Sequence, residues 1–97
     1  MYARVTTFQI EPAKLDEALE VSRSAILPAM KQQQGFQGIL SLVDRQMGKA
    51  TSITLWETEA DLKAGESSGY YQQQVGKLAP FVAAPPVREI YEATMDT

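Results

Sequence analysis

The segment from Gly35 to Glu57, GFQGILSLVDRQMGKATSITLWE, decides the fold of this chain. It contains two runs rich in Ile, Leu, Val and Thr, which are bounded by glycines and separated by Met47-Gly48-Lys49. Apolar runs around a glycine-containing turn predict a β-hairpin, here with strands at 37–45 and 50–57. A helical pattern precedes the hairpin and another follows it, so the hairpin is the middle of a larger unit.

The residues before the hairpin predict a strand and a helix. Strand-forming residues occupy 2–10, and Pro12 then stands where the first turn of a helix accepts proline. The helix shows an apolar stripe at three- and four-residue steps. Pro28 should kink it, or end its regular part near Leu27, because proline cannot donate to the preceding turn. Gly35 is the expected stop.

The residues after the hairpin predict a second helix and a last strand. Thr58 is the expected N-cap of the helix, and Gly65 and Gly69 should interrupt it. Residues 87–93 follow a proline pair and form the last strand. The order β-α-β-β-α-β predicts one α+β domain over residues 1–97, with the ferredoxin-like fold. In this fold one antiparallel sheet carries both helices on a single face.

Both faces of this sheet are predicted to be partly apolar. In the third strand Ile53 and Leu55 alternate with Thr54 and Trp56, so each face receives large side chains. A sheet with one solvated face shows polar residues on that face. Because the two helices cover only one side, we expect a second copy of the sheet to cover the other. The sequence therefore predicts a two-fold homodimer.

The composition excludes several classes of function. The chain of 97 residues has no Cys, His or Asn, so cysteine and histidine metal sites and His-dependent catalytic triads are not expected. A net charge of −3, scattered basic residues and the lack of alternating aromatics in the third strand argue against a nucleic-acid partner. No membrane span or signal-peptide core is evident, and we expect a cytoplasmic protein with no membrane partner.

Several motifs in this order resemble the antibiotic biosynthesis monooxygenase (ABM) superfamily. They are IEPAKLDE at 10–17, GFQG at 35–38, LWETEADL at 55–62, SGYY at 68–71 and Pro85-Pro86 before the last strand. The resemblance covers nearly the whole chain. It implies a dimeric α/β barrel with a pocket in each protomer between sheet and helices. It also implies either cofactor-free oxygenation of anthrones or quinols with O2, or degradation of haem.

The haem-degrading branch is not expected here. That branch uses a His in the second helical segment, an Asn on the first strand and a Trp on the second helix. The matching places hold Gly76, Thr6 or Thr7, and Gly65. The cofactor-free branch uses a Trp at the end of the third strand, which Trp56 matches. It also uses an Asn before that Trp, where Ser52 stands in this chain.

From this resemblance and from side-chain chemistry we select candidate site residues, with no cofactor and no metal. Hydroxyl and indole donors could stabilise a developing oxyanion, and aromatic walls could orient a planar ligand. The catalytic candidates are Trp56, Ser52 and Tyr71. The candidates for substrate binding are Thr6, Phe8, Tyr70 and Arg88.

Each candidate also has a purely structural interpretation. Trp56 could be a core indole on a central strand, and the tyrosine pair could simply pack. Arg4 and Arg88 lie on strands expected to be neighbours and could bind an anionic oxygen, but pairing with Glu89 or Glu92 is the favoured interpretation. The two glutamine triplets at 32–34 and 72–74 are interpreted as solvated helix ends.

Two functional hypotheses from different classes remain. The first is a cofactor-independent monooxygenase acting on a small planar phenolic, quinol or anthrone-type substrate with O2. In it the protein supplies desolvation, orientation and hydrogen bonds. The second is a non-catalytic dimeric barrel that binds a small apolar ligand in a regulatory or stress-related role.

Overall fold

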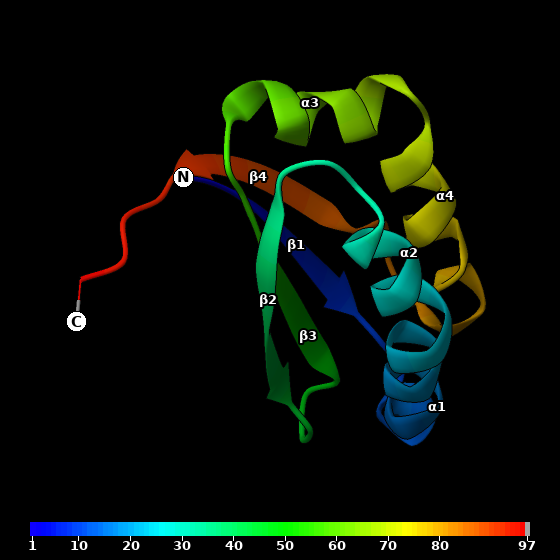
Figure 1. The fold of residues 1–97 in the computed structure, drawn as a ribbon. Helices are drawn as coiled ribbons and strands as arrows, with labels where there is room; N and C mark the ends of the chain where they lie inside the picture. Colours follow the sequence, from blue (N-terminus) through cyan, green and yellow to red (C-terminus); the bar gives the residue numbers. More distant parts are fainter. Residues whose placement is uncertain (97) are drawn as a thin grey trace.

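The computed structural model describes residues 1–96 and shows one sheet with all helical segments on one side of it (Figure 1). The strands are β1 (Tyr2–Gln9), β2 (Phe36–Asp44), β3 (Lys49–Trp56) and β4 (Val87–Glu92). The helical segments are η1 (Pro12–Lys14), α1 (Leu15–Val21), η2 (Ser22–Ile26), α2 (Leu27–Lys31), α3 (Glu59–Ser67), α4 (Tyr70–Gly76) and η3 (Ala79–Phe81).

The sheet has the order β2-β3-β1-β4, and all three neighbouring pairs are antiparallel. This confirms the predicted ferredoxin-like α+β fold. The hairpin strands each begin and end one residue earlier than predicted. A bulge between Phe36 and Gly38 shifts the register where β2 begins. Beyond it, Ile39 pairs with Thr54 and Ser41 with Ser52, while β1 places Thr6 opposite Ser52.

The first helix is interrupted near Pro28, as its sequence predicts. The interruption is a π-helical stretch, η2, in which the N–H of Leu27 bonds to the carbonyl of Ser22. Pro28 has no N–H to offer, and its ring would press on the carbonyl of the preceding turn in a regular helix. The wider π turn relieves this contact and places Ile26 and Met30 in the core. Gly35, at φ 81°, follows the turn that ends this helix.

The second helical region breaks at only one of the two predicted glycines. Thr58 caps α3 by accepting a hydrogen bond from the backbone N–H of Asp61 at 3.1 Å, as predicted. The break falls at Gly69, whose φ of 85° ends one helix and precedes the next. The predicted interruption at Gly65 is wrong, because Gly65 lies buried inside α3. A Cβ there would lie 3.3 Å from the Tyr70 ring.

The turn between β2 and β3 is tightly anchored. Asp44 accepts hydrogen bonds from the backbone N–H groups of Gln46 and Met47 through Oδ1, both at 3.1 Å. Gly48 is buried at φ 72°, and its carbonyl accepts the N–H of Ile10 at 2.8 Å. A Cβ on Gly48 would lie 2.0 Å from the Ile10 carbonyl oxygen. Glycine is therefore required both by the left-handed backbone and by this close approach.

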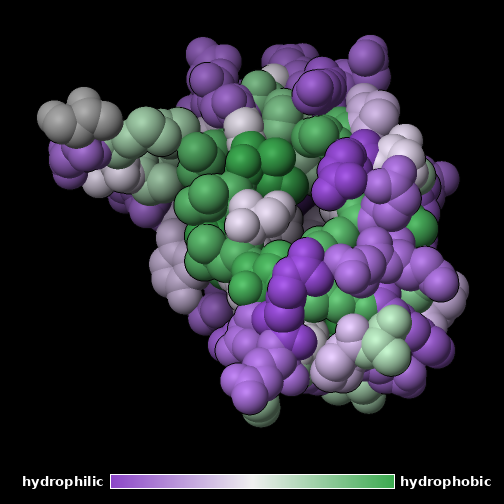
Figure 2. All heavy atoms as spheres, turned by 90° about the horizontal axis from the view of Figure 1, so that it is seen from below, coloured by the Kyte–Doolittle hydropathy of each residue, from purple (hydrophilic) through white to green (hydrophobic). Residues whose placement is uncertain are grey.

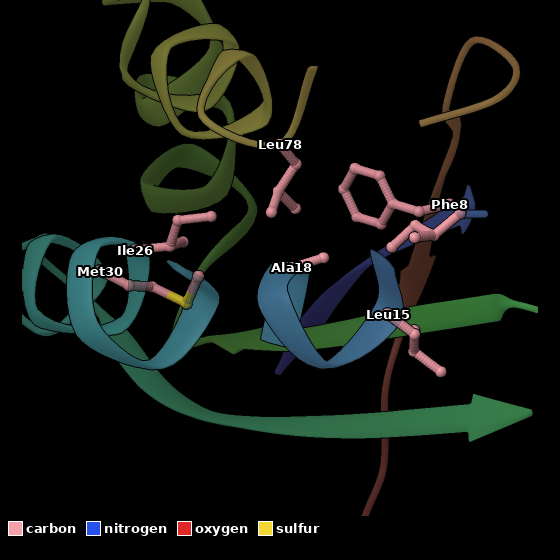
Figure 3. Packing of buried hydrophobic residues seen from close by; sticks show 7 residues of the cluster. Phe8, Leu15, Ala18, Ile26, Met30 and Leu78 are labelled. Atoms are coloured by element: carbon pink, nitrogen blue, oxygen red, sulfur yellow. The ribbon is translucent and has the colours of Figure 1, made fainter. Parts of the chain in front are cut away.

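The core lies between the sheet and the helices (Figure 3). Alternation along β1 sends Phe8 to the helix side, and Ile10 follows just beyond the strand. The helices contribute one apolar stripe each. The buried cluster consists of Phe8, Ile10, Leu15, Ala18, Ile26, Met30 and Leu78. Its members come from β1, the first helix and the segment after α4, so packing here fixes the position of α4 over the sheet.

The sheet face turned away from the helices, called here the open face, is rich in exposed apolar side chains. Strand register places Leu40, Leu42, Ile53, Leu55, Val87 and Tyr91 on it. Leu40 is 56% exposed and Val87 58% exposed. Figure 2, viewed from the end that carries the β2–β3 turn, shows hydrophobic residues gathered between the C-terminal tail and the hydrophilic helical side. Both faces of the sheet are thus apolar, as the strand pattern predicts.

Candidate functional site

A cavity between the sheet and the helices forms the candidate site, and we call it the inner cavity. It offers about 60 Å³ to the centre of a water-sized molecule. Its apolar walls are Phe8, Ile26, Met30, Ile39, Val75 and Leu78. Its polar lining is Arg4, Thr6, Ser22, Ser52, Thr54, Tyr70, Tyr71 and Gln74. Strand alternation puts the β1 and β3 members on the helix side, and the break at Gly69 turns both tyrosines of α4 toward them.

Five of the seven candidate residues line this cavity. Thr6 and Phe8 come from β1, Ser52 from β3, and the two tyrosines from the start of α4. The other two candidates, Trp56 and Arg88, are not among its lining residues. The structure therefore brings most of the candidate residues together at one end of the layer between sheet and helices.

Tyr71 and Thr6 form a hydrogen-bonded hydroxyl pair, with 3.0 Å between Oη and Oγ1. Either hydroxyl can donate to the other, so one proton of the pair remains available for a ligand. Thr6 is buried and lies opposite Ser52 on β3. Three hydroxyl-bearing residues therefore share one region of the cavity lining.

Tyr70 adds a hydroxyl without a partner. Among the residues that the structure describes, its Oη is the one buried side-chain polar atom that makes no hydrogen bond. Burial raises the pKa of the Tyr70 phenol above its ordinary value, and the positive charge of Arg4 opposes this effect. A buried hydroxyl without a partner costs about 1–3 kcal/mol, so a ligand or water that accepts or donates there would be favoured.

Arg4 is a buried cation with an elaborate set of partners. Only 3% of its surface is exposed. Its Nε donates to Glu66 at 3.0 Å and its Nη2 donates to the carbonyl of Leu62 at 2.8 Å. The guanidinium carbon lies 4.4 Å from the ring centroid of Tyr71 and 5.5 Å from that of Trp56. Such contacts compensate for the desolvation of the charge.

Trp56 lies under α3 as a core residue and is only 1% exposed. Its indole N–H donates to the Thr54 hydroxyl at 2.9 Å, and Phe36 meets its ring edge to face at 5.7 Å. The geometry thus matches the structural interpretation of this residue. Trp56 touches the site indirectly, because Thr54 and Arg4 both line the inner cavity.

The favoured pairing of Arg4 and Arg88 with Glu89 or Glu92 is wrong. Both arginines instead bind Glu66 on α3, one through each carboxylate oxygen. Strand register excludes Glu89 as the partner, because Arg4 and Arg88 face the helices whereas Glu89 faces the other way. The Glu89 carboxylate accepts a hydrogen bond from Tyr91, which raises the pKa of that phenol.

The interpretation of the two glutamine triplets as solvated helix ends is wrong for one residue, Gln74. Gln74 is buried, lines the inner cavity and accepts a hydrogen bond from Lys77 at 2.8 Å. Sequence reasoning missed Gln74, Thr54 and Ser22 as lining residues. One signal was available for Gln74, which lies one helical turn after Tyr70 and therefore shares its helix face.

Two further hollows, of about 40 and 280 Å³, adjoin the inner cavity on the side of the edge strand β2. Ser22, at the start of η2, lines all three hollows. The three hollows therefore lie next to one another between the first helix and β2. In residues 1–96 no group of three or more metal-ligating side chains comes together, and no helix of this part is long and apolar enough to cross a membrane.

Comparisons with known proteins point to one family. A family model described as antibiotic biosynthesis monooxygenase matches residues 1–77. Two uncharacterized proteins of Mycobacterium tuberculosis H37Rv are each 34% identical over 64 residues, which make up 66% of this chain. The matched segments make up 27% and 29% of those two proteins. This chain therefore matches less than a third of the length of these curated relatives.

Solved structures share the fold at low sequence identity. A Nitrosomonas europaea protein described as a candidate antibiotic biosynthesis monooxygenase superposes with a TM-score of 0.76 at 17% identity, over 98% of this chain and 100% of that one. The ActVA-Orf6 monooxygenase of Streptomyces coelicolor, solved with nanaomycin D, gives 0.74 at 17% identity over 99% and 89%. These likenesses establish the fold.

Proposed function

Since this chain belongs to the antibiotic biosynthesis monooxygenase family, we propose that it oxygenates a small planar phenolic, quinol or anthrone-type substrate with O2 in the inner cavity. The observation that carries the proposal is the cluster of hydroxyls at one end of an apolar chamber. The Tyr71–Thr6 pair and the unpartnered Tyr70 hydroxyl supply donors, while Phe8 and the helix residues supply flat apolar walls.

The proposed chemistry uses the substrate's own anion to activate O2. A methylene or hydroxyl beside the aromatic system loses a proton, and the anion transfers an electron to O2. The resulting pair combines to form a carbon–oxygen bond and a peroxide. At a methylene carbon, loss of water from the protonated peroxide leaves a carbonyl. One CH2 group and one O2 molecule thus give one C=O group and one water.

The protein's part in this reaction is orientation, exclusion of water and hydrogen bonding to the developing oxyanion. Tyr71 and Thr6 are assigned as donors to that oxygen, with Ser52 across the sheet from Thr6. Trp56 is assigned an indirect role, because its indole holds the Thr54 hydroxyl. The neighbouring hollow that shares Ser22 with the inner cavity is assigned as the path of the substrate from the surface.

Oxygen uptake with a panel of anthrones and quinols tests the proposal. We expect uptake that depends on the protein and falls about a hundred- to a thousandfold in Tyr71→Phe, which removes a donor from the oxyanion site. Ser67→Ala, an exposed change on α3, is the matched control and should retain activity. A panel without any protein-dependent uptake, or equal rates in Tyr71→Phe and the wild type, contradicts the oxygenase assignment.

Ligand binding without catalysis is the second candidate function. It is favoured by the absence of a carboxylate, lysine or histidine among the residues described as lining the inner cavity, because a general base is missing there. Trp56 is the one tryptophan of the chain and is bonded to a lining residue. A change in its fluorescence on adding a planar ligand, with no oxygen uptake, would favour this second candidate.

A two-fold homodimer through the open face is part of the proposal. Leu40, Leu42, Val87 and Tyr91 are each at least half exposed on this face, which is unusual for a solvated surface. An ordinary interface covers about 800 Å² per partner, or about 13% of the 5963 Å² surface. A second copy offers the same apolar sheet and closes the face symmetrically. A monomer mass by light scattering at micromolar concentration contradicts it.

A further inference from the structure

The inner cavity contains a single formal charge, and this charge is positive. Of its lining residues within the described part of the chain, only Arg4 carries a formal charge. The guanidinium and the carboxylate of Glu66 pair at 3.0 Å, and Glu66 is shared with Arg88. Two positive charges and one negative charge leave this cluster with a net charge of +1. The cluster is locally positive in a chain whose net charge is −3.

The position of Arg4 is fixed from several sides. Glu66 and the Leu62 carbonyl hold Nε and Nη2, while Tyr71 and Trp56 contact the guanidinium through their rings. Gly65 lies beside this arrangement, where a Cβ would be in ordinary van der Waals contact with Nη2 at 3.6 Å. A cation held in this way needs no reorganisation when an anion arrives, which is the condition for strong electrostatic recognition.

Hydroxyl donors belong to the same lining. The Tyr71 ring that contacts the guanidinium carries the hydroxyl bonded to Thr6, and the unpartnered Tyr70 hydroxyl lines the same cavity. A carboxylate, phenolate or enolate oxygen accepts hydrogen bonds from several donors at once. The charge and the donors therefore suit a flat ligand with one anionic oxygen better than a neutral one.

We propose that Arg4 makes the inner cavity an anion-binding subsite, which takes the substrate as its phenolate or enolate. This inference rests on the proposed function and deepens it by naming the ionisation state of the substrate. With this subsite the reaction needs no general base in the cavity, because binding at Arg4 selects a substrate that has already lost its proton to water. Glu66 serves as a positioning residue for Arg4.

The test uses 7-hydroxycoumarin, a planar phenol whose neutral and ionised forms absorb at different wavelengths. Its pH titration in the presence and absence of protein measures the affinity for each form. An opposite charge within about 4–6 Å stabilises an ion by one to three pKa units, so we expect the phenolate to bind about ten- to a thousandfold more tightly than the phenol. The methyl ether, 7-methoxycoumarin, should bind no more tightly than the phenol.

Arg4→Met should abolish this preference, while Arg45→Gln is the matched control and should retain it, because Arg45 is exposed, pairs with Asp16 and does not line the cavity. If Arg4→Met does not fold, Arg4→Gln combined with Glu66→Gln removes both buried partners and leaves only the exposed Arg88 without a carboxylate. Equal binding of phenol and phenolate overturns the proposal. A preference that survives the loss of Arg4 overturns it as well, and so does the absence of binding up to the solubility limit.

These outcomes are separate from those of the oxygenase assay. A phenolate preference that requires Arg4, without oxygen uptake, would contradict the oxygenase assignment and support the anion subsite. Oxygen uptake with no phenolate preference would support the oxygenase and contradict the subsite.

Discussion

Replacing Tyr70 with Phe should leave the protein at least as stable as the wild type and weaken ligand binding. The hydroxyl is buried without a partner, which costs about 1–3 kcal/mol, while the ring packs against the core and is retained in Phe. We expect a gain of up to about 1 kcal/mol in the free energy of unfolding. For a domain of this size that gain raises the melting temperature by roughly 4–8 °C.

Tyr71→Phe is the matched control, one residue away. It removes the hydrogen bond to Thr6 and leaves a buried threonine hydroxyl without that partner. We expect it to lose about 1–2 kcal/mol. Urea unfolding followed by far-ultraviolet circular dichroism gives both values. If Tyr70→Phe loses as much stability as Tyr71→Phe, the Tyr70 hydroxyl has a partner in solution and the reasoning is refuted.

The wild type and Tyr70→Phe should also differ in their stability at alkaline pH. The pKa of Tyr70 is raised in the folded state, so the stability that depends on the neutral phenol is present below its ordinary value of 10.0. That stability is lost as the pH rises through the raised value. The wild type should therefore lose stability faster than Tyr70→Phe as the pH rises above 10.0. For binding, we expect Tyr70→Phe to weaken 7-hydroxycoumarin affinity about three- to tenfold.

Three other predictions address the charge cluster, the turn and the open face. Glu66→Gln should lower the free energy of unfolding by about 2–3 kcal/mol and Arg88→Gln by less than about 1 kcal/mol. The reason is that only Glu66→Gln leaves a buried arginine without its carboxylate. Equal losses in urea unfolding would contradict this. Gly48→Ala should lower the free energy of unfolding by about 3 kcal/mol or more, and Gly69→Ala by about 1–2 kcal/mol. Both glycines have positive φ, but only at Gly48 would the added Cβ meet a carbonyl oxygen. Similar losses in the two variants would show that this contact relaxes. Leu40→Asp should shift the mass measured by light scattering to that of a monomer, and an unchanged dimer mass would place the interface elsewhere.

The fold was largely predictable because its signals are local. Alternation along the strands, Pro12 at the start of a helix and Thr58 as a cap each depend on a few neighbouring residues. Their order leaves few topologies, because crossover connections have a fixed hand. The missed π segment also had a local signal. Ala18, Ser22, Ile26 and Met30 recur at strict four-residue steps, which is longer than the 3.6-residue period of a regular helix.

The site was less predictable because its key contacts join distant parts of the chain. Thr6, Phe8 and Ser52 were selected from the family resemblance and from side-chain chemistry, and all three line the inner cavity. The partner of Arg4 is Glu66, 62 residues away, and no spacing rule identifies it. The pairing rule for adjacent strands failed here. It considers neighbours within the sheet, whereas these arginines point out of the sheet toward α3.

The anchored β2–β3 turn has a consequence for engineering. Hairpin tips usually accept inserted peptides because they touch little else. Here three hydrogen bonds anchor the tip. The Ile10 N–H donates to the Gly48 carbonyl, and the Gln9 side chain donates to the Met47 carbonyl at 2.6 Å. Arg45 donates to the Asp16 carboxylate at 2.8 Å. An affinity tag or loop grafted into residues 45–48 would pull on the junction between β1 and the first helix. This tip is therefore a poor insertion site, although its position at the end of a hairpin would recommend it.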